Sequence, residues 1–241
     1  MVKTAKHPRY LWLDVSRGLA VCAMIIYHFI FDLSWFQLIN VNFYEDSIPR
    51  ITRALIVFSF LFIVGISLRV AGEMQQRSTA FWRRFIKISL CALLVTVASY
   101  FAFPQSFIYF GILHFIALAS LLAHPFVRVP KVAFVVGIAV IVAGLTLASP
   151  LFNPRYLSWI GFVTELPRTE DFVPLFPWLG VVLLGIAFQA TSWGFKKQSV
   201  AVKHNIALRS LSWAGRRSLW IYMLHQPILI GVLWLILYLY T

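Results

Sequence analysis

Residues 13–33 read LDVSRGLAVCAMIIYHFIFDL, a long apolar run that contains two aspartates, an arginine and a histidine. A helix needs about 20 apolar residues to cross a bilayer, and this run has that length. Ionisable groups cost several kcal/mol when they face lipid, so the helix has to turn its polar residues toward protein or a water-filled cavity. The stretch therefore predicts a membrane-spanning helix with one polar face.

The whole chain has the composition of an integral membrane protein. Of its 241 residues 61% are hydrophobic and only 12% are charged, about half the charged fraction of an ordinary soluble domain. The net charge of +13 does not indicate a nucleic-acid partner, because the basic residues lie between apolar runs and not on one soluble domain. Cys22 and Cys91 lie within apolar runs and predict neither a disulfide framework nor a metal site.

Seven segments qualify, or nearly qualify, as membrane spans. They cover residues 11–38, 53–72, 82–103, 107–123, 131–149, 174–193 and 214–239. The first run is long and is expected to be retained and not cleaved as a signal peptide. We expect an all-α, polytopic membrane helix bundle of about seven transmembrane helices that forms a single domain over residues 1–241.

The positions of Lys and Arg predict the orientation of the bundle, because cytoplasmic loops of membrane proteins are enriched in both. With the N-terminus inside, four cations fall in outer segments: Arg50, Arg53, Arg155 and Arg168. The other seventeen fall in inner segments: Lys3, Lys6, Arg9, Arg17, Arg69, Arg77, Arg83, Arg84, Lys87, Arg128, Lys131, Lys196, Lys197, Lys203, Arg209, Arg216 and Arg217. This bias predicts a cytoplasmic N-terminus and an outer C-terminus.

The polar residues of the first span share one face. Arg17 and His28 are eleven positions apart, so they differ by about 20° in direction and about 16 Å along the helix axis. Asp14 lies about 60° to one side of Arg17, and Asp32 lies about 40° beyond His28. Because Asp32 follows His28 by four residues, its carboxylate can accept the imidazole N–H and fix the tautomer. The pair is therefore a candidate base with its orienting group.

Each of these residues also has a simpler interpretation. Arg17 could extend to the cytoplasmic interface while it is held near Asp14. His28 could be a neutral, hydrogen-bonded interior histidine, and Asp32 could be merely interfacial.

The sequence of the first span, 13–20 LDVSRGLA followed by Met24 and Tyr27-His28, resembles that of membrane acyltransferases. In the acyltransferase-3 family ten residues separate an arginine from a histidine in this helix, as they separate Arg17 from His28. The wider resemblance is to bacterial relatives of the heparan-α-glucosaminide N-acetyltransferase catalytic domain. It extends over most of the chain through 62–69 FIVGISLR, 109–114 YFGILH, 176–180 FPWLG and 218–227 SLWIYMLHQP.

The resemblance implies acyl transfer more strongly than it implies a heparan substrate. The animal enzyme has more spans and a large luminal domain, and it carries asparagine where this chain has His28. Its catalytic histidine lies farther along its chain. The resemblance implies a membrane acyltransferase that moves an acyl group, acetyl above all, from cytoplasmic acyl-CoA to an acceptor.

Acyl transfer needs a general base, groups that stabilise the developing oxyanion, and groups that bind the acyl donor. His28 with Asp32 is the candidate base, and acylation of His28 itself stays open. Because acyl-CoA is a cytoplasmic metabolite, its phosphates are expected to bind cationic side chains at the inner face. The candidates are Arg17, Arg69, Arg83, Arg84 and Lys87, although the last three would also serve topology alone.

Further polar residues are candidates for the acceptor site. His114 and Tyr109 belong to the fourth predicted span, where Gly111 allows close approach of a helix or ligand. His225 and Gln226 precede Pro227, which frees a backbone carbonyl in the last span. Trp178 is either part of an aromatic belt or a wall for a sugar ring. No spacing of His, Cys or carboxylates predicts a metal.

The expected activity is acyl-CoA-dependent O- or N-acyl transfer to a glycan or a lipid-linked sugar acceptor, in the bacterial cytoplasmic (inner) membrane. The partners expected are membrane lipid, acyl-CoA and this acceptor. Oligomeric state is left open, and a homo-oligomer is compatible with the sequence. Two alternatives remain: a small proton-coupled transporter, in which Asp32, His28 and His114 relay protons, and a non-catalytic membrane scaffold.

Overall fold

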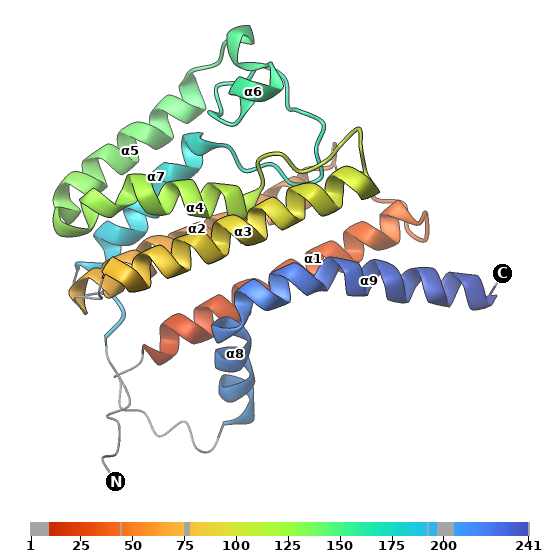
Figure 1. Cartoon of the computed structure of the whole chain (residues 1–241), viewed down its shortest axis with the longest axis horizontal. Coiled ribbons are helices and arrows are strands. Elements are labelled where there is room, and N and C mark those ends of the chain that lie inside the picture. The colour runs from red at the N-terminus through yellow and green to blue at the C-terminus, as the bar shows by residue number, and fades with distance from the viewer. Residues whose placement is uncertain (1–9, 44, 75–77, 192, 197–204, 241) are drawn as a thin grey trace. The chain divides into compact units, whose positions relative to one another are not determined.

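A computed structural model describes residues 10–43, 45–74, 78–191, 193–196 and 205–240. Every regular element within these ranges is a helix, which confirms the all-α prediction (Figure 1). The elements are α1 (Leu11–Trp35), α2 (Ser47–Glu73), α3 (Ser78–Ala102), α4 (Ile112–Ala123), η1 (His124–Arg128), α5 (Pro130–Thr146), η2 (Pro150–Phe152), α6 (Arg155–Ser158), α7 (Leu175–Gln189), α8 (Ile206–Arg216) and α9 (Ser218–Tyr240).

Four of the seven predicted spans are confirmed as helices long and apolar enough to cross a membrane. Within the described residues these are α1, α2, α3 and residues Ser218–Leu239 of α9. The other three predicted spans are apolar but shorter: Ile112–Arg128, Pro130–Thr146 and Leu175–Gln189. A helix of 17 residues, the length of α5, is about 26 Å long, somewhat less than the ~30 Å hydrocarbon core. The chain is a multi-pass membrane protein.

Two predicted boundaries differ from the structure. Residues 107–111 are not helical, because α4 begins only at Ile112. The predicted last span, 214–239, is divided, and its first residues belong to a separate helix, α8. Of the cations used to predict orientation, Lys3, Lys6, Arg9, Arg77, Lys197 and Lys203 lie outside the described residues.

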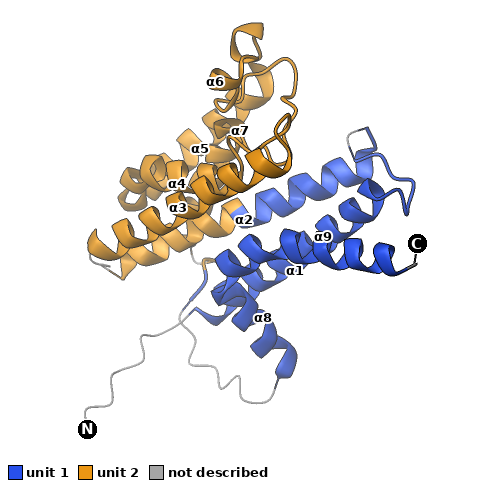
Figure 2. Ribbon diagram, turned by 45° about the vertical axis from the view of Figure 1, so that its right-hand side comes forward, with its two compact units in different colours: residues 1–60, 195–241 blue, residues 61–194 orange. Residues whose placement is uncertain are grey.

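The chain forms two compact units, which Figure 2 distinguishes by colour. Unit 1 contains Met1–Phe60 and Phe195–Thr241, and unit 2 contains Leu61–Gly194. Helix α2 runs from one into the other. Unit 1 therefore contains the first helix of the chain, α1, together with the last two, α8 and α9.

Glycines allow close helix contacts within each unit. In unit 1, a Cβ at Gly18 would collide with the carbonyl of Leu211 in α8, and a Cβ at Gly215 would collide with the carbonyl of Asp14 in α1. In unit 2, Gly137 of α5 and Gly180 of α7 each lie against the other's carbonyl. Small residues at such positions let helix backbones approach closely, as is common in membrane proteins.

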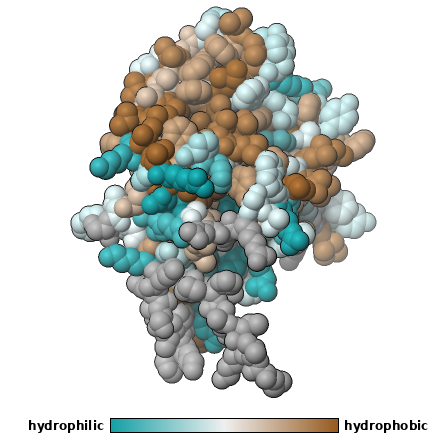
Figure 3. All heavy atoms as spheres, turned by 60° about the vertical axis from the view of Figure 1, so that its left-hand side comes forward, coloured by the Kyte–Doolittle hydropathy of each residue, from teal (hydrophilic) through white to brown (hydrophobic). Residues whose placement is uncertain are grey.

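Large apolar side chains remain exposed along the helices. On α3 they include Leu90, Leu93 and Leu94, each more than half exposed, and on α5 they include Val135 and Leu145. Hydrophobic side chains also cover a broad area of the face drawn in Figure 3. Lipid is the medium that such surfaces fit.

Candidate active site

Four polar side chains meet where α1 and α9 pack together in unit 1. They are His28 and Asp32 from α1 and His225 and Gln226 from α9, and we call them the α1–α9 cluster. Asp32 is only 2% exposed and His225 is buried, although both helices are largely apolar. Polar groups buried in such surroundings need partners, so the bonding of each atom matters.

Asp32 is bound by Gln226. The Gln226 side-chain Nε2 donates to Asp32 Oδ1 at 2.6 Å. This differs from the predicted pairing, in which Asp32 orients His28 from the same helix. The other two oxygens, Asp32 Oδ2 and Gln226 Oε1, are buried and receive no hydrogen bond from any of the described residues. The cluster thus presents two buried acceptor oxygens to a donor that a ligand could supply.

The two imidazoles of the cluster lie side by side, with ring centroids 4.9 Å apart and ring planes at 61°. His225 Nδ1 is 2.6 Å from the carbonyl oxygen of Tyr222, which can only accept, so Nδ1 carries a proton. The tautomer of the neutral His225 ring is therefore fixed. Among the described residues the structure records no hydrogen bond to either ring nitrogen of His28, which is partly buried.

Aromatic rings and a proline shape the surroundings of the cluster. The edge of Tyr27 contacts His28 at a centroid distance of 5.7 Å, and Tyr27 also contacts Phe43 at 5.4 Å. Pro227 lies inside α9 directly after Gln226. Because proline lacks an N–H, the carbonyl of Met223 loses its helical partner at this level.

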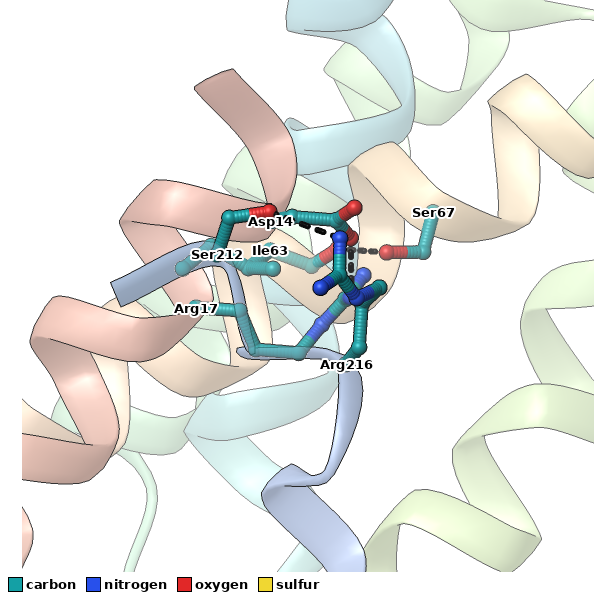
Figure 4. A network of polar contacts seen from close by, with 6 residues as sticks. All are labelled: Asp14, Arg17, Ile63, Ser67, Ser212 and Arg216. Atoms are coloured by element: carbon teal, nitrogen blue, oxygen red, sulfur yellow. Dashed lines mark hydrogen bonds and ion pairs between the residues drawn. The ribbon is translucent and has the colours of Figure 1, made fainter. Parts of the chain in front are cut away.

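A second polar group, the arginine cluster, lies where α1 packs on α8 (Figure 4). It consists of Asp14, Arg17, Ser212 and Arg216. Arg17 Nη1 is 3.2 Å from Asp14 Oδ1, and Arg216 Nη1 donates to Ser212 Oγ at 3.2 Å. Two guanidinium groups with one carboxylate leave an excess positive charge, which suits a phosphate.

Neither Ser212 nor Arg216 was a candidate site residue from sequence. Arg216 counted only as an inner-loop cation, because a helix with the polar composition of α8 gives no span signal. The contact between α1 and α8 has one signal in the sequence: a glycine stands next to each arginine, Gly18 next to Arg17 and Gly215 next to Arg216.

His114 has both ring nitrogens bonded within unit 2. Its Nδ1 accepts from the Gly111 N–H at 3.2 Å, and its Nε2 is 2.9 Å from Thr96 Oγ1. The Thr96 hydroxyl donates to the Ile108 carbonyl at 2.7 Å, so it accepts from His114. Asp171 Oδ2 accepts from the next N–H, that of Ile112, at 2.8 Å. These bonds begin α4 at Ile112 and hold His114 in place without a ligand.

Tyr109 and Trp178, the other two acceptor candidates of unit 2, lie near the ends of helices. The Tyr109 hydroxyl is 2.6 Å from Ser158 Oγ, and the Arg155 guanidinium lies 5.5 Å from the centre of its ring. Trp178 is partly buried in α7, directly after the cis Phe176–Pro177 bond. The structure does not join either residue to the α1–α9 cluster within one unit.

The four cations predicted for donor binding besides Arg17 also belong to unit 2. Arg69 donates from Nε to Glu73 Oε1 at 3.0 Å and from Nη1 to the Val127 carbonyl, so it connects the end of α2 with η1. Arg83, Arg84 and Lys87 are exposed on α3. Among the described residues no group of three His, Cys, Asp or Glu side chains could hold a metal ion.

Comparison with known families gives a match that covers most of the chain. The family described as "Heparan-alpha-glucosaminide N-acetyltransferase, catalytic" matches residues 9–227. This range includes both polar clusters of unit 1 and all of unit 2. No curated protein and no solved structure gives a significant match.

Proposed function

Because the chain belongs to the heparan-α-glucosaminide N-acetyltransferase catalytic family, we propose that it transfers an acetyl group from cytoplasmic acetyl-CoA to a sugar acceptor reached from the outer face of a bacterial inner membrane. The family supports transferase activity in a membrane. The donor, the acceptor and the orientation are our inferences from the clusters of unit 1 and from the distribution of cations.

The observation that carries the proposal is the α1–α9 cluster. Burying an acceptor without a donor costs about 1–3 kcal/mol, and the cluster has two, Asp32 Oδ2 and Gln226 Oε1. Sugars present hydroxyl and amine donors that can bond both. Next to these acceptors His28 offers an imidazole, the commonest general base. A sugar that bonds these oxygens would therefore lie beside the proposed base.

In the proposed reaction His28 takes the proton of the acceptor amine or hydroxyl as the acceptor attacks the thioester carbonyl. The bond from carbonyl carbon to acceptor forms, and the bond from carbonyl carbon to sulfur breaks. His28 then gives its proton to the departing thiolate, so the products are the acetylated sugar and free CoA. Asp32 favours the transient imidazolium one turn away, and His225, held by the Tyr222 carbonyl, packs against the His28 ring.

The arginine cluster fits the donor's phosphates. Arg17 and Arg216 come from different helices and approach the same region, where planar guanidinium groups can each give two hydrogen bonds to a phosphate (Figure 4). Arg17 lies about 16 Å along α1 from His28. A donor with its thioester far from its phosphates, as in acetyl-CoA, can therefore contact both clusters.

The test is acetyl transfer by the purified protein in detergent, with glucosamine and lipid-linked glucosamine as acceptors. We expect His28→Gln to reduce kcat by about 10²–10⁴-fold, the usual contribution of a general base, while calorimetry shows unchanged acetyl-CoA binding. His124→Gln is the matched control, because His124 contacts Phe81 in unit 2 and belongs to neither cluster. Transfer at the wild-type rate by folded His28→Gln would refute the assignment. Proton-coupled uptake of a solute by the protein in vesicles, without acetyl transfer, would support the transporter alternative.

A further inference from the structure

Helix α8 has two different faces. The face that packs on α1 includes Ser212 and Gly215, both of which are buried. At 100° per residue, Ile206, Arg209 and Trp213 lie on the other side of the helix, within about 60° of one another. Ile206 is 79% exposed, Trp213 is 49% exposed, and Arg209 is exposed as well. Two large apolar side chains and a cation thus share one exposed face.

Arg217, the residue directly after α8, extends this face. Its guanidinium lies 4.6 Å from the centre of the Trp213 ring, a geometry in which the cation is attracted to the face of the indole. We call Ile206, Arg209, Trp213 and Arg217 the outer face of α8. Tryptophan together with arginine is typical of the membrane–water interface, where the ring contacts acyl chains and the cation stays near the headgroups.

The outer face of α8 is positively charged. Residues 172–241 contain six Lys and Arg residues and no Asp or Glu. Neither Arg209 nor Arg217 forms an ion pair with any of the described residues. Helices that combine cations with large apolar side chains bind anionic lipids through both properties. The charge and the exposed apolar groups of this face are therefore complementary to an anionic amphiphile.

The position of α8 in unit 1 brings its outer face to the membrane surface. Only Arg217 separates α8 from α9, and residues Ser218–Leu239 of α9 are long and apolar enough to cross a membrane. Helix α8 therefore lies at one end of that span. In Figure 1 and Figure 2 it also runs across the direction of α1 and α9 and not along it. A helix with this position and direction lies along the bilayer surface, where its outer face contacts lipid headgroups.

We propose that the outer face of α8 binds the headgroup of an anionic phospholipid from the surrounding bilayer. Arg209 and Arg217 contact the phosphate, and Ile206 and Trp213 lie against the upper part of the acyl chains. Guanidinium groups suit this role because each can give two hydrogen bonds to one phosphate. The proposal goes beyond acetyl transfer and does not depend on it, since neither arginine belongs to the arginine cluster.

The experiment is photo-crosslinking of the full-length protein in phosphatidylcholine vesicles that contain a trace of a photoreactive lipid. The two probes are phosphatidylglycerol and phosphatidylcholine with the same diazirine in the upper acyl chain, and mass spectrometry locates the label. We expect phosphatidylglycerol to label residues 206–217 more strongly than phosphatidylcholine does. This preference should fall by about fivefold for each arginine lost, so Arg209→Gln/Arg217→Gln should remove most of it. Raising the salt from about 0.1 M to about 1 M should weaken it too, because the Debye length shortens from about 10 Å to about 3 Å.

The matched control is Arg128→Gln/Lys131→Gln, which removes two exposed cations that have no tryptophan between them. It should leave the labelling of residues 206–217 unchanged. Labelling by phosphatidylcholine should be equal in all three proteins, which shows that α8 keeps its place.

Equal labelling of residues 206–217 by the two probes would overturn the proposal, as would a preference that survives in Arg209→Gln/Arg217→Gln. An equal loss in the control variant would reduce the effect to overall charge and refute a site on α8. Loss of the preference on adding millimolar glycerol phosphate or acetyl-CoA would also refute it, because the face would then bind a soluble phosphate and not a lipid.

Discussion

The bond between Asp32 and Gln226 can be tested with two single variants and their combination. Asp32→Ala leaves the partly buried Gln226 amide without its acceptor, which costs about 1–3 kcal/mol of unfolding free energy. Gln226→Met keeps the side-chain volume but leaves the 2% exposed carboxylate of Asp32 without its donor, at a cost of at least about 1–3 kcal/mol. In the double variant neither group is left unpaired. Its destabilisation should be smaller than the sum by about 1.5–3 kcal/mol, the value of a charge-assisted hydrogen bond.

The assay combines unfolding and transfer on the same detergent samples. The unfolding free energies give the coupling energy between Asp32 and Gln226. The rate of acetyl transfer shows whether the α1–α9 cluster takes part in the reaction. If it does, the double variant recovers stability but transfers acetyl more slowly than wild type, because the acceptor loses both buried oxygens, Asp32 Oδ2 and Gln226 Oε1. Additive destabilisation would refute the bond, and full transfer by the double variant would refute the placement of the reaction at the α1–α9 cluster.

Three further variants and one control test helix packing in unit 1, the start of α4 in unit 2, and donor binding. Gly18→Ala places a methyl group against the Leu211 carbonyl and should lower the free energy of unfolding by about 1–3 kcal/mol. The control Gly231→Ala has open space around it and should leave that free energy unchanged or slightly raised. Equal effects of the two variants would contradict the close packing of α1 on α8. Asp171→Ala removes the acceptor at the start of α4 and should cost about 0.5–2 kcal/mol, and an unchanged melting temperature would exclude that role. Arg17→Ala should raise the KM for acetyl-CoA by about tenfold or more with kcat nearly unchanged, and a fall in kcat alone would argue against phosphate binding.

The first span could be predicted well from sequence because both of its signals are local. Its length follows from an uninterrupted apolar run, and its polar face follows from the helical period that places Arg17, His28 and Asp32 together. The structure confirms the helix over Leu11–Trp35 and buries Asp32. Whether these residues catalyse a reaction stays a prediction.

The partners of these residues could not be predicted, because they come from distant parts of the chain. Gln226 is 194 residues from Asp32, and no local pattern connects the two. The i+4 spacing favoured His28 as the partner of Asp32, but the facing helix provides an amide at 2.6 Å. The start of α4 was misplaced for the same reason, since Asp171, 59 residues away, binds the N–H of Ile112.

Helix α8 was missed for a different reason. Hydropathy detects helices that are apolar on all sides, whereas Ile206–Arg216 is polar along one face and follows residues rich in cations. Its role depends on backbone contact, because Gly215 and Gly18 let the two helices meet without side chains between them. Composition assigned residues 206–213 to an inner loop and residues 214–216 to the last span.

Both polar clusters of unit 1 depend on the first helix and on the last two. Asp14 and Arg17 meet Ser212 and Arg216 of α8, and one half-helix further along α1 His28 and Asp32 meet His225 and Gln226 of α9. A single rigid helix thus fixes the separation between the two sets of groups at about 16 Å. A substrate that bridges them has to match this length, because neither cluster can shift along α1. We therefore expect selection by the position of the thioester relative to the phosphates, and little selection by the apolar residues between the clusters.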